Sequence, residues 1–261
     1  MVFFSGCQDM SCLEGKIYMY KQRGSSIRKL LVYEGNKFFL QRKNHLIFTT
    51  IFLVSGVYAV LLIQKGLAST EIILKSLTLF RPLYWLLCCY VICDILGSDY
   101  HYKTLKNVLP PVHRSSYLAT KILVSGGIGT GIFAIHILTT VVVSVLSGNR
   151  ELSWSTLLLP IFLGVVIGIC CLVGVFLTSI TLFENEAVAV GLSVGIVILL
   201  FILESLEPLT DYLPTLWVLL FPTLFRIDLE KVLLIILITW ISLFLIFSFA
   251  IHSFKKKDIF L

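Results

Sequence analysis

Six continuous apolar runs limit the folds that this sequence can adopt. They cover residues 45–64, 76–96, 122–146, 157–183, 187–203 and 231–251. A helix needs roughly 20 apolar residues to cross the core of a bilayer, and continuous rather than alternating runs favour helices over barrel strands. With 57% hydrophobic and 14% charged residues, the chain is excluded from the ordinary soluble class. We predict an all-α integral membrane protein in which residues 1–24 form a flexible leader and residues 25–261 form one domain with six transmembrane helices.

The positions of the basic side chains predict how these helices are oriented. Fifteen of the 21 Lys and Arg residues lie on the side that holds both chain ends and the polar stretch between the second and third runs. Because cytoplasmic loops are rich in Lys and Arg, we expect both termini in the cytoplasm. The predicted location is the plasma membrane, crossed several times. Membrane lipid is therefore an expected partner, and nucleic acid is not.

Residues 25–44 combine apolar and basic side chains at helical spacing. Leu30 and Phe38 belong to the apolar set, and Lys37 and Arg42 to the basic one. This pattern predicts a helix that lies in the membrane interface, with its basic groups near anionic lipid. Glu34 falls on the apolar side, where pairing with a nearby base or snorkelling is favoured over contact with a partner protein.

The longest polar interval between two apolar runs extends from Asp94 to Lys121. Its middle, residues 100–109, can form a short helix with Leu105 on one side, and Asp99 would stabilise the N-terminus of that helix. Pro110 and Pro111 would end it. We interpret the interval as a cytoplasmic coupling loop. From spacing alone, a solvated loop that only connects two spans is the more common structure.

Small residues and prolines mark further positions in the apolar part of the chain. Glycines four residues apart at 127 and 131, 164 and 168, and 191 and 195 place small residues on one helix face, which allows helices to approach closely. Packing within one chain is favoured over a dimer seam. Residues 204–230 are interrupted by Pro208, Pro214 and Pro222, which predicts an irregular segment.

The sequence contains no pattern typical of an enzyme or a metal site. Its seven cysteines and five histidines show no ligand spacing, and of the histidines only His136 is expected to be buried, in a structural role. No phosphate-binding loop or nucleophile motif is present, and no charge pair lies at the middle of a span, as a proton-coupled carrier would need. We therefore predict no catalytic residue, no metal and no bound cofactor, and an energy source on a partner.

The polar interval resembles the hallmark region of ABC-2 transporter permeases. That family has an acid, then Thr-Leu-Lys, then Pro-Val/Ile-Ser-Arg and a downstream Lys. The matching residues here are Asp99, Thr104-Leu105-Lys106, Pro111-Val-His-Arg114 and Lys121. The chain departs from the pattern with Asp for the commoner Glu, Lys103 for Gly and His113 for Ser. Residues 33–43 are similar to the family's elbow helix and residues 254–259 to its C-terminal ending, so the resemblance extends from about residue 25 to 261.

This resemblance implies an exporter of type V architecture, in which two permease chains pair above two separate ATPase subunits that bind ATP and magnesium. The pair could be a homodimer or a heterodimer. The implied site residues fall into four groups. They are the main ATPase-coupling residues Asp99, Tyr102, Thr104, Leu105, Lys106, Pro111 and Arg114; a second coupling turn with Glu184 and Glu186; the elbow residues Glu34, Lys37 and Arg42; and an outer gate of re-entrant helices with Pro208, Pro214, Trp217 and Pro222.

The expected function is ATP-driven export of a hydrophobic or amphipathic peptide or antibiotic by a permease of a Gram-positive bacterium. Two alternatives stay open: a membrane scaffold or sensor subunit that transports nothing, and an exporter of a lipid-linked or polysaccharide substrate. A membrane enzyme would require polar residues that converge at one membrane face, and the sequence has no such cluster.

Overall fold

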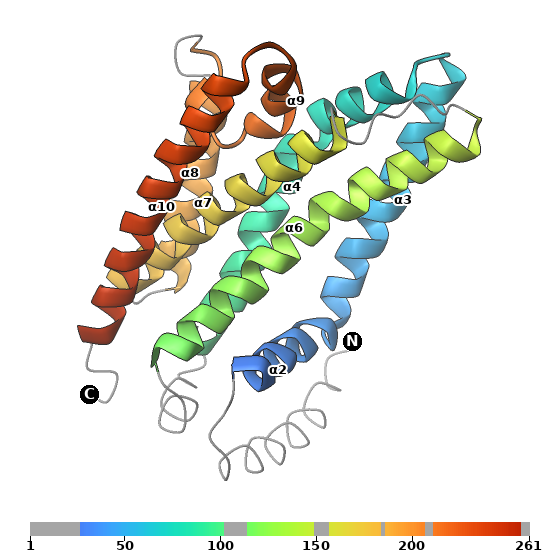
Figure 1. The fold of residues 1–261 in the computed structure, drawn as a ribbon. Helices are drawn as coiled ribbons and strands as arrows, with labels where there is room; N and C mark the ends of the chain where they lie inside the picture. The colour runs from blue at the N-terminus through green and yellow to red at the C-terminus, as the bar shows by residue number, and fades with distance from the viewer. Residues whose placement is uncertain (1–26, 102–113, 149–156, 184–185, 207–210, 257–261) are drawn as a thin grey trace.

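The computed structural model describes residues 27–101, 114–148, 157–183, 186–206 and 211–256 (Figure 1). These residues form eight helices and no strand. The helices are α2 (Ile27–Phe39), α3 (Arg42–Gln64), α4 (Ser69–His101), α6 (Arg114–Leu146), α7 (Leu159–Phe183), α8 (Glu186–Leu203), α9 (Trp217–Ile227) and α10 (Leu229–Lys256). The all-α prediction is confirmed for this part of the chain.

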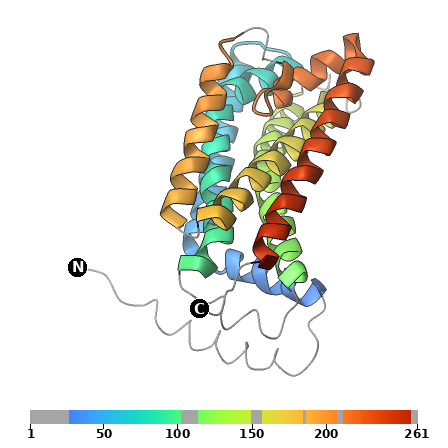
Figure 2. The same ribbon diagram turned by 90° about the vertical axis from the view of Figure 1, so that its left-hand side faces the viewer.

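The long helices run side by side, and a short helix lies at each end of the bundle. Figures 1 and 2 show α2 across the end where α4 finishes and α6 begins, and α9 at the opposite end. We call these the α2 end and the α9 end. The main core is built from the facing sides of α3, α4, α6, α7 and α8, and a smaller cluster joins α9 to α7 and α10.

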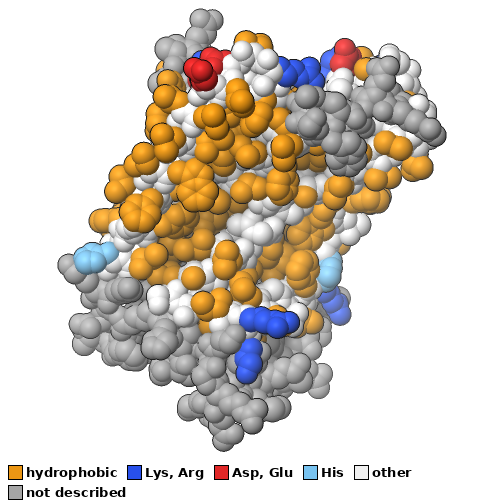
Figure 3. Space-filling model, viewed as in Figure 1, with side chains coloured by type: hydrophobic (Ala, Val, Ile, Leu, Met, Phe, Trp, Pro, Cys, Tyr) orange, Lys and Arg blue, Asp and Glu red, His pale blue; other side chains and the backbone are white. Residues whose placement is uncertain are grey.

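Five helices have the length and composition needed to cross a membrane: Arg42–Gln64, Ser69–Ile95, Ser115–Leu146, Leu159–Phe183 and Leu229–Ser253. In Figure 3 hydrophobic side chains cover the middle of one face, and charged side chains gather toward its two ends. The chain is therefore a multi-pass α-helical membrane protein. The apolar part of α8, Ala187–Leu203, is shorter, so the sixth crossing stays a prediction.

The helices at the polar interval are longer than the sequence pattern predicted. The second span was expected to begin at residue 76, but α4 begins at Ser69 and pairs the side chains of Glu71 and Lys75 one helical turn apart. α4 also continues through Asp99 to His101, and α6 begins at Arg114. Asp99 thus lies in the last turn of α4 and not at the start of a separate helix. Hydropathy marks where a helix leaves lipid, whereas its backbone hydrogen bonds can continue into water.

Residues 204–230 are more regular than the three prolines suggested. α9 occupies Trp217–Ile227 and contains Pro222. Pro222 lies in the second turn of α9, and its side chain is buried with that of Trp217. α9 packs mainly on α7, with further contacts to α10 and α4. Packing on these neighbours supplies the stability that the sequence of this short helix does not supply alone.

Gly164 and Gly168 let α7 approach the segment around α9 closely. A Cβ atom on Gly164 would lie 2.6 Å from the carbonyl oxygen of Trp217, and one on Gly168 would lie 2.5 Å from the ring of Trp85. These two glycines therefore serve packing within one chain, as the sequence pattern favoured. By contrast, a Cβ on Gly127, Gly131, Gly191 or Gly195 would meet no described atom within 4 Å beyond its chain neighbours and the backbone of its own helix.

Replacing Gly164 by alanine is expected to lower the free energy of unfolding by about 1–3 kcal/mol, because the new methyl group meets backbone atoms that cannot rotate away. The matched control is Gly127→Ala on the exposed side of α6, where the same change meets open space. There we expect a gain of about 0.5–1 kcal/mol from helix propensity. Denaturant titration in mixed micelles measures the free energy of unfolding of both variants. Equal changes would contradict the close approach of α7 to the backbone at Trp217.

Candidate functional site

A buried ion pair joins three helices at the α2 end. Lys121 Nζ of α6 donates to Glu34 Oε2 of α2 at 2.8 Å and to the carbonyl oxygen of Ile95 in α4 at 3.1 Å. The two charged side chains are only 2% and 6% exposed. The ring of Tyr117 lies 5.6 Å from the Lys121 ammonium and adds a cation–π contact. Lys121 therefore ties α2 to both helices that flank residues 102–113.

The sequence of α2 explains why an acid is buried there. Leu30, Glu34 and Phe38 are spaced four residues apart, so they lie on one helix face, and all three are buried. A lone buried carboxylate would be strongly unfavourable, and a base in contact with it offsets much of that penalty. The expectation that Glu34 pairs with a base is confirmed, and Lys121 is the base.

A second ion pair at this end is more exposed. Lys43 Nζ, near the start of α3, donates to Asp94 Oδ1 of α4 at 2.6 Å, and the side chains are 44% and 25% exposed. The Lys43 ammonium also lies 5.8 Å from the centre of the Tyr90 ring. Because water screens this pair, its contribution to stability is about 1 kcal/mol or less.

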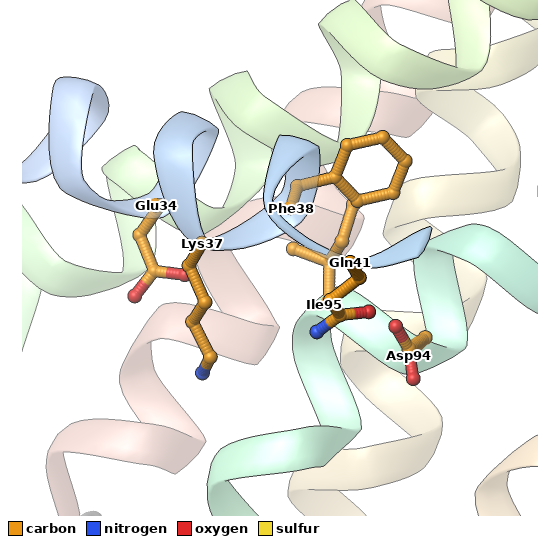
Figure 4. Close-up of a pocket in the computed structure, with 6 residues that line it drawn as sticks. All are labelled: Glu34, Lys37, Phe38, Gln41, Asp94 and Ile95. Carbon is orange, nitrogen blue, oxygen red and sulfur yellow. The ribbon is translucent and has the colours of Figure 1, made fainter. Parts of the chain in front are cut away.

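A small pocket separates the two ion pairs. Figure 4 shows its lining, which comes from α2, the residues that follow α2, and α4. The lining residues are Glu34, Lys37, Phe38, Gln41, Asp94 and Ile95. Its volume of about 10 Å³ is close to the space of one water molecule. The pocket is therefore too small for an organic ligand, and this end of the bundle is a packed junction.

The predicted coupling residues that the structure describes lie at the ends of helices at this junction. Asp99 is in the last turn of α4, Arg114 begins α6 and Glu186 begins α8, and Figure 2 places the start of α8 at the same end as α2. Of the elbow residues, Glu34 and Lys37 belong to α2, whereas Arg42 begins α3. The remaining coupling residues lie outside the described ranges: Tyr102, Thr104, Leu105, Lys106, Pro111 and Glu184.

The predicted outer-gate residues lie at the α9 end. Trp217 begins α9, and its Nε1 donates to the carbonyl oxygen of Asp211 at 3.0 Å. The side chain of Asp211 also accepts from the ammonium of Lys231 at the start of α10. The carbonyl oxygen of Pro214 lies over Gly168 of α7. Pro208 lies outside the described residues.

The interior between α3, α4 and α6 contains a polar cluster around His136. Its Nδ1 lies 2.7 Å from Ser55 Oγ and 2.9 Å from the Tyr84 hydroxyl, and its Nε2 lies 3.2 Å from Ser76 Oγ. Ser76 donates its own proton to the carbonyl of Ile73, so it accepts from Nε2–H, and Nδ1 accepts from a hydroxyl. A neutral His136 thus satisfies every group in the cluster, and its predicted burial is confirmed.

Arg81 and Glu204 form a buried pair at the α9 end that sequence reasoning missed. Nη2 of Arg81 donates to Glu204 Oε2 at 2.6 Å, across 123 residues of sequence. The side chains are 9% and 13% exposed. The sequence shows two opposite charges near the ends of apolar runs. Hydropathy does not predict that these two side chains are in contact.

The described residues offer no group of three or more His, Cys, Asp or Glu side chains that could hold a metal ion. Their functional features are the packed junction at the α2 end, the His136 cluster and the Arg81–Glu204 pair. A scan against protein-family models finds no match to the chain, and neither does a comparison with curated proteins.

Proposed function

We propose that the chain is the membrane-spanning subunit of an ATP-driven exporter of the ABC-2 permease type. Two such chains, identical or related, would pair in the plasma membrane of a Gram-positive bacterium, with the α2 end and both termini in the cytoplasm. Two separate ATPase subunits would bind there and supply ATP hydrolysis with magnesium. The exported substrate would be a hydrophobic or amphipathic peptide or antibiotic.

The Glu34–Lys121–Ile95 junction is the observation that best supports this proposal. Five of the main coupling residues proposed to contact the ATPase lie between His101, the last residue of α4, and Arg114, the first residue of α6: Tyr102, Thr104, Leu105, Lys106 and Pro111. Lys121 is two helical turns from that start and bonds to both α2 and α4. A push on residues 102–113 would thus move α4, α6 and α2 together as one rigid unit instead of bending a loose loop.

The proposed transport step is a rocking motion of the two permease halves. Closure of the ATPases would push the coupling residues, and the α9 end would open outward between α3, α4 and α8. The short length of α9 and its position at that end suit a segment that covers an exit. This arrangement also satisfies the rule that irregular backbone at membrane depth must be covered by protein or water.

Changing Thr104 and Leu105 to aspartate together is expected to uncouple the ATPase. Loss of an anchoring leucine removes about 1.5–3 kcal/mol of apolar contact, which weakens association about 10- to 100-fold. The measurement is ATP hydrolysis by the reconstituted complex, together with co-purification of the ATPase through a tag on this chain. The control is Gln64→Asp, which places a charge at the exposed last residue of α3 at the opposite end.

Three results of this experiment distinguish the possibilities. An exporter loses both co-purification and substrate-stimulated hydrolysis in the double variant and keeps them in the control. A scaffold or sensor subunit also loses co-purification but shows no export in the wild type. If the double variant binds and stimulates an ATPase normally, the coupling assignment is wrong.

A further inference from the structure

The Arg81–Glu204 pair is incomplete, in contrast to the pair at the α2 end. Only one of the three guanidinium nitrogens, Nη2, is bonded to the carboxylate. Among the described residues, Arg81 Nε and Nη1 and Glu204 Oε1 are buried and have no hydrogen-bond partner. One aromatic ring, that of Phe201 in α8, lies 5.8 Å from the guanidinium carbon. Lys121 and Glu34 leave no such orphaned side-chain atom in the described part of the chain.

These orphaned atoms make the closed pair only weakly favourable. A buried polar group without a partner is unfavourable by about 1–3 kcal/mol, and the desolvation of a buried ion pair can exceed its Coulomb attraction. When the two side chains separate into water, all three orphaned atoms gain hydrogen bonds. The joined and separated states therefore differ less in free energy than burial of opposite charges alone would suggest.

The Arg81–Glu204 pair lies where a relative movement of α4 and α8 would separate it. Glu204 directly follows the last residue of α8, and Arg81 directly precedes Pro82 inside α4. Proline has no backbone N–H, so it removes one intrahelical hydrogen bond and allows a helix to bend, and α4 changes direction along its length in Figure 1. The pair thus joins the end of α8 to a bending point of α4.

We propose that Arg81 and Glu204 form a releasable lock between α4 and α8 at the α9 end of the bundle. In the described state the pair holds the two helices together. When α8 moves away from α4, water hydrates the orphaned groups and offsets the lost attraction. The role of this lock in opening an exit rests on the proposed exporter function. The contact between Arg81 and Glu204, and its small net contribution to stability, do not depend on that function.

The lock predicts opposite effects for two variants at the same site. Glu204→Gln leaves an uncompensated buried guanidinium, so amide hydrogen exchange at the end of α8 is expected to become at least about tenfold faster. The double variant Arg81→Met/Glu204→Leu removes every orphaned group. It is expected to raise the midpoint of thermal unfolding by about 2–8 °C and to slow exchange at the end of α8 below the wild-type rate.

The matched control is Lys43→Met/Asp94→Leu, which replaces an ion pair of the same 2.6 Å length at the α2 end. That change is expected to leave exchange at the end of α8 unchanged. The proposal fails if the apolar double variant at 81 and 204 is less stable than the wild type and shows faster amide hydrogen exchange at the end of α8. The ion pair would then simply stabilise the folded state. The proposal also fails if neither variant changes exchange there.

A second arm separates failure of the lock from failure of the exporter assignment. In the complex with its ATPase in lipid nanodiscs, ATP with vanadate is expected to speed exchange at the end of α8 in the wild type and not in the apolar double variant. An unresponsive wild type would contradict the exporter function while the comparison without ATP still tests the lock. A response of equal size in the apolar double variant would overturn the lock.

Discussion

Replacing Lys121 by methionine is expected to lower the free energy of unfolding by about 3–5 kcal/mol, because it leaves the carboxylate of Glu34 buried without a counter-charge. The change also removes the hydrogen bond to the Ile95 carbonyl. Unfolding by sodium dodecyl sulfate in mixed micelles, followed by circular dichroism, measures the difference. Because α2 loses its tie to α4 and α6, we also expect faster proteolysis within α2.

Two further variants show whether the buried charge causes the loss. Lys43→Met removes a lysine whose ion pair is partly exposed to solvent, and this change should cost at most about 1 kcal/mol. The double variant Glu34→Leu/Lys121→Met removes both buried charges and should recover most of the stability, because apolar replacements of a buried pair are often neutral or better. A double variant as unstable as Lys121→Met would contradict the electrostatic explanation.

Replacing Trp85 by alanine is expected to cost about 3–5 kcal/mol, the range for a large buried aromatic side chain. Trp85 is almost completely buried, packs against Phe133 of α6 with ring centres 5.1 Å apart, and lies directly over Gly168 of α7. Its Nε1 also donates to the carbonyl oxygen of Thr215, before α9. The loss should therefore loosen α9 as well as the core, which denaturant titration and hydrogen exchange of α9 can detect.

A lipid-facing tryptophan provides the control for this prediction. Trp240 in α10 is 66% exposed, so Trp240→Ala removes the same side chain with little change in packing inside the bundle. A compensating change tests the geometry: Gly168→Ala, whose methyl group clashes with Trp85 in the wild type, should be less destabilising in the Trp85→Ala background, where the Pro214 carbonyl oxygen 3.0 Å away remains as a close contact. Equal losses for Trp85→Ala and Trp240→Ala would contradict the assigned packing.

The sequence was sufficient to predict the helices that lie in lipid. Apolar runs are long because every backbone group in a bilayer must be bonded within its own segment, so hydropathy located α3, α4, α6, α7 and α10 correctly. It predicted the last residues of α3 and α7 correctly but misplaced the first residues of α4 and α6. α4 begins at Ser69 and α6 at Arg114 because helical hydrogen bonding continues past the apolar run, and hydropathy does not record hydrogen bonding.

The pairing of charges was predicted only in part. The helical period of α2 placed Glu34 on an apolar face and favoured either pairing with a base or snorkelling. Which base it was could not be known, because Lys121 comes 87 residues later and its approach depends on how α2 lies across α4 and α6. Arg81 and Glu204 illustrate the same limit, since their contact spans 123 residues and two helices.

The roles of the predicted site residues remain predictions. Asp99, Arg114 and Glu186 lie at the ends of helices at the α2 end, as the coupling assignment requires. Their contact with an ATPase depends on the assembled complex. The spacing of apolar residues in one chain does not show what surface a partner protein presents to it. The experiments on Thr104, Leu105 and the Arg81–Glu204 pair therefore test coupling and helix movement, which the periodicity of the sequence does not predict.

The long separation between Glu34 and Lys121 has a consequence for how the protein is made. A ribosome that adds about 5–20 residues per second needs roughly 4–17 s to synthesise the 87 residues between them. During that time Glu34 has no lysine partner from α6. The Glu34–Lys121 contact therefore forms only after Lys121 has been synthesised, so this tie between α2 and α6 is made late in the synthesis of the first three spans.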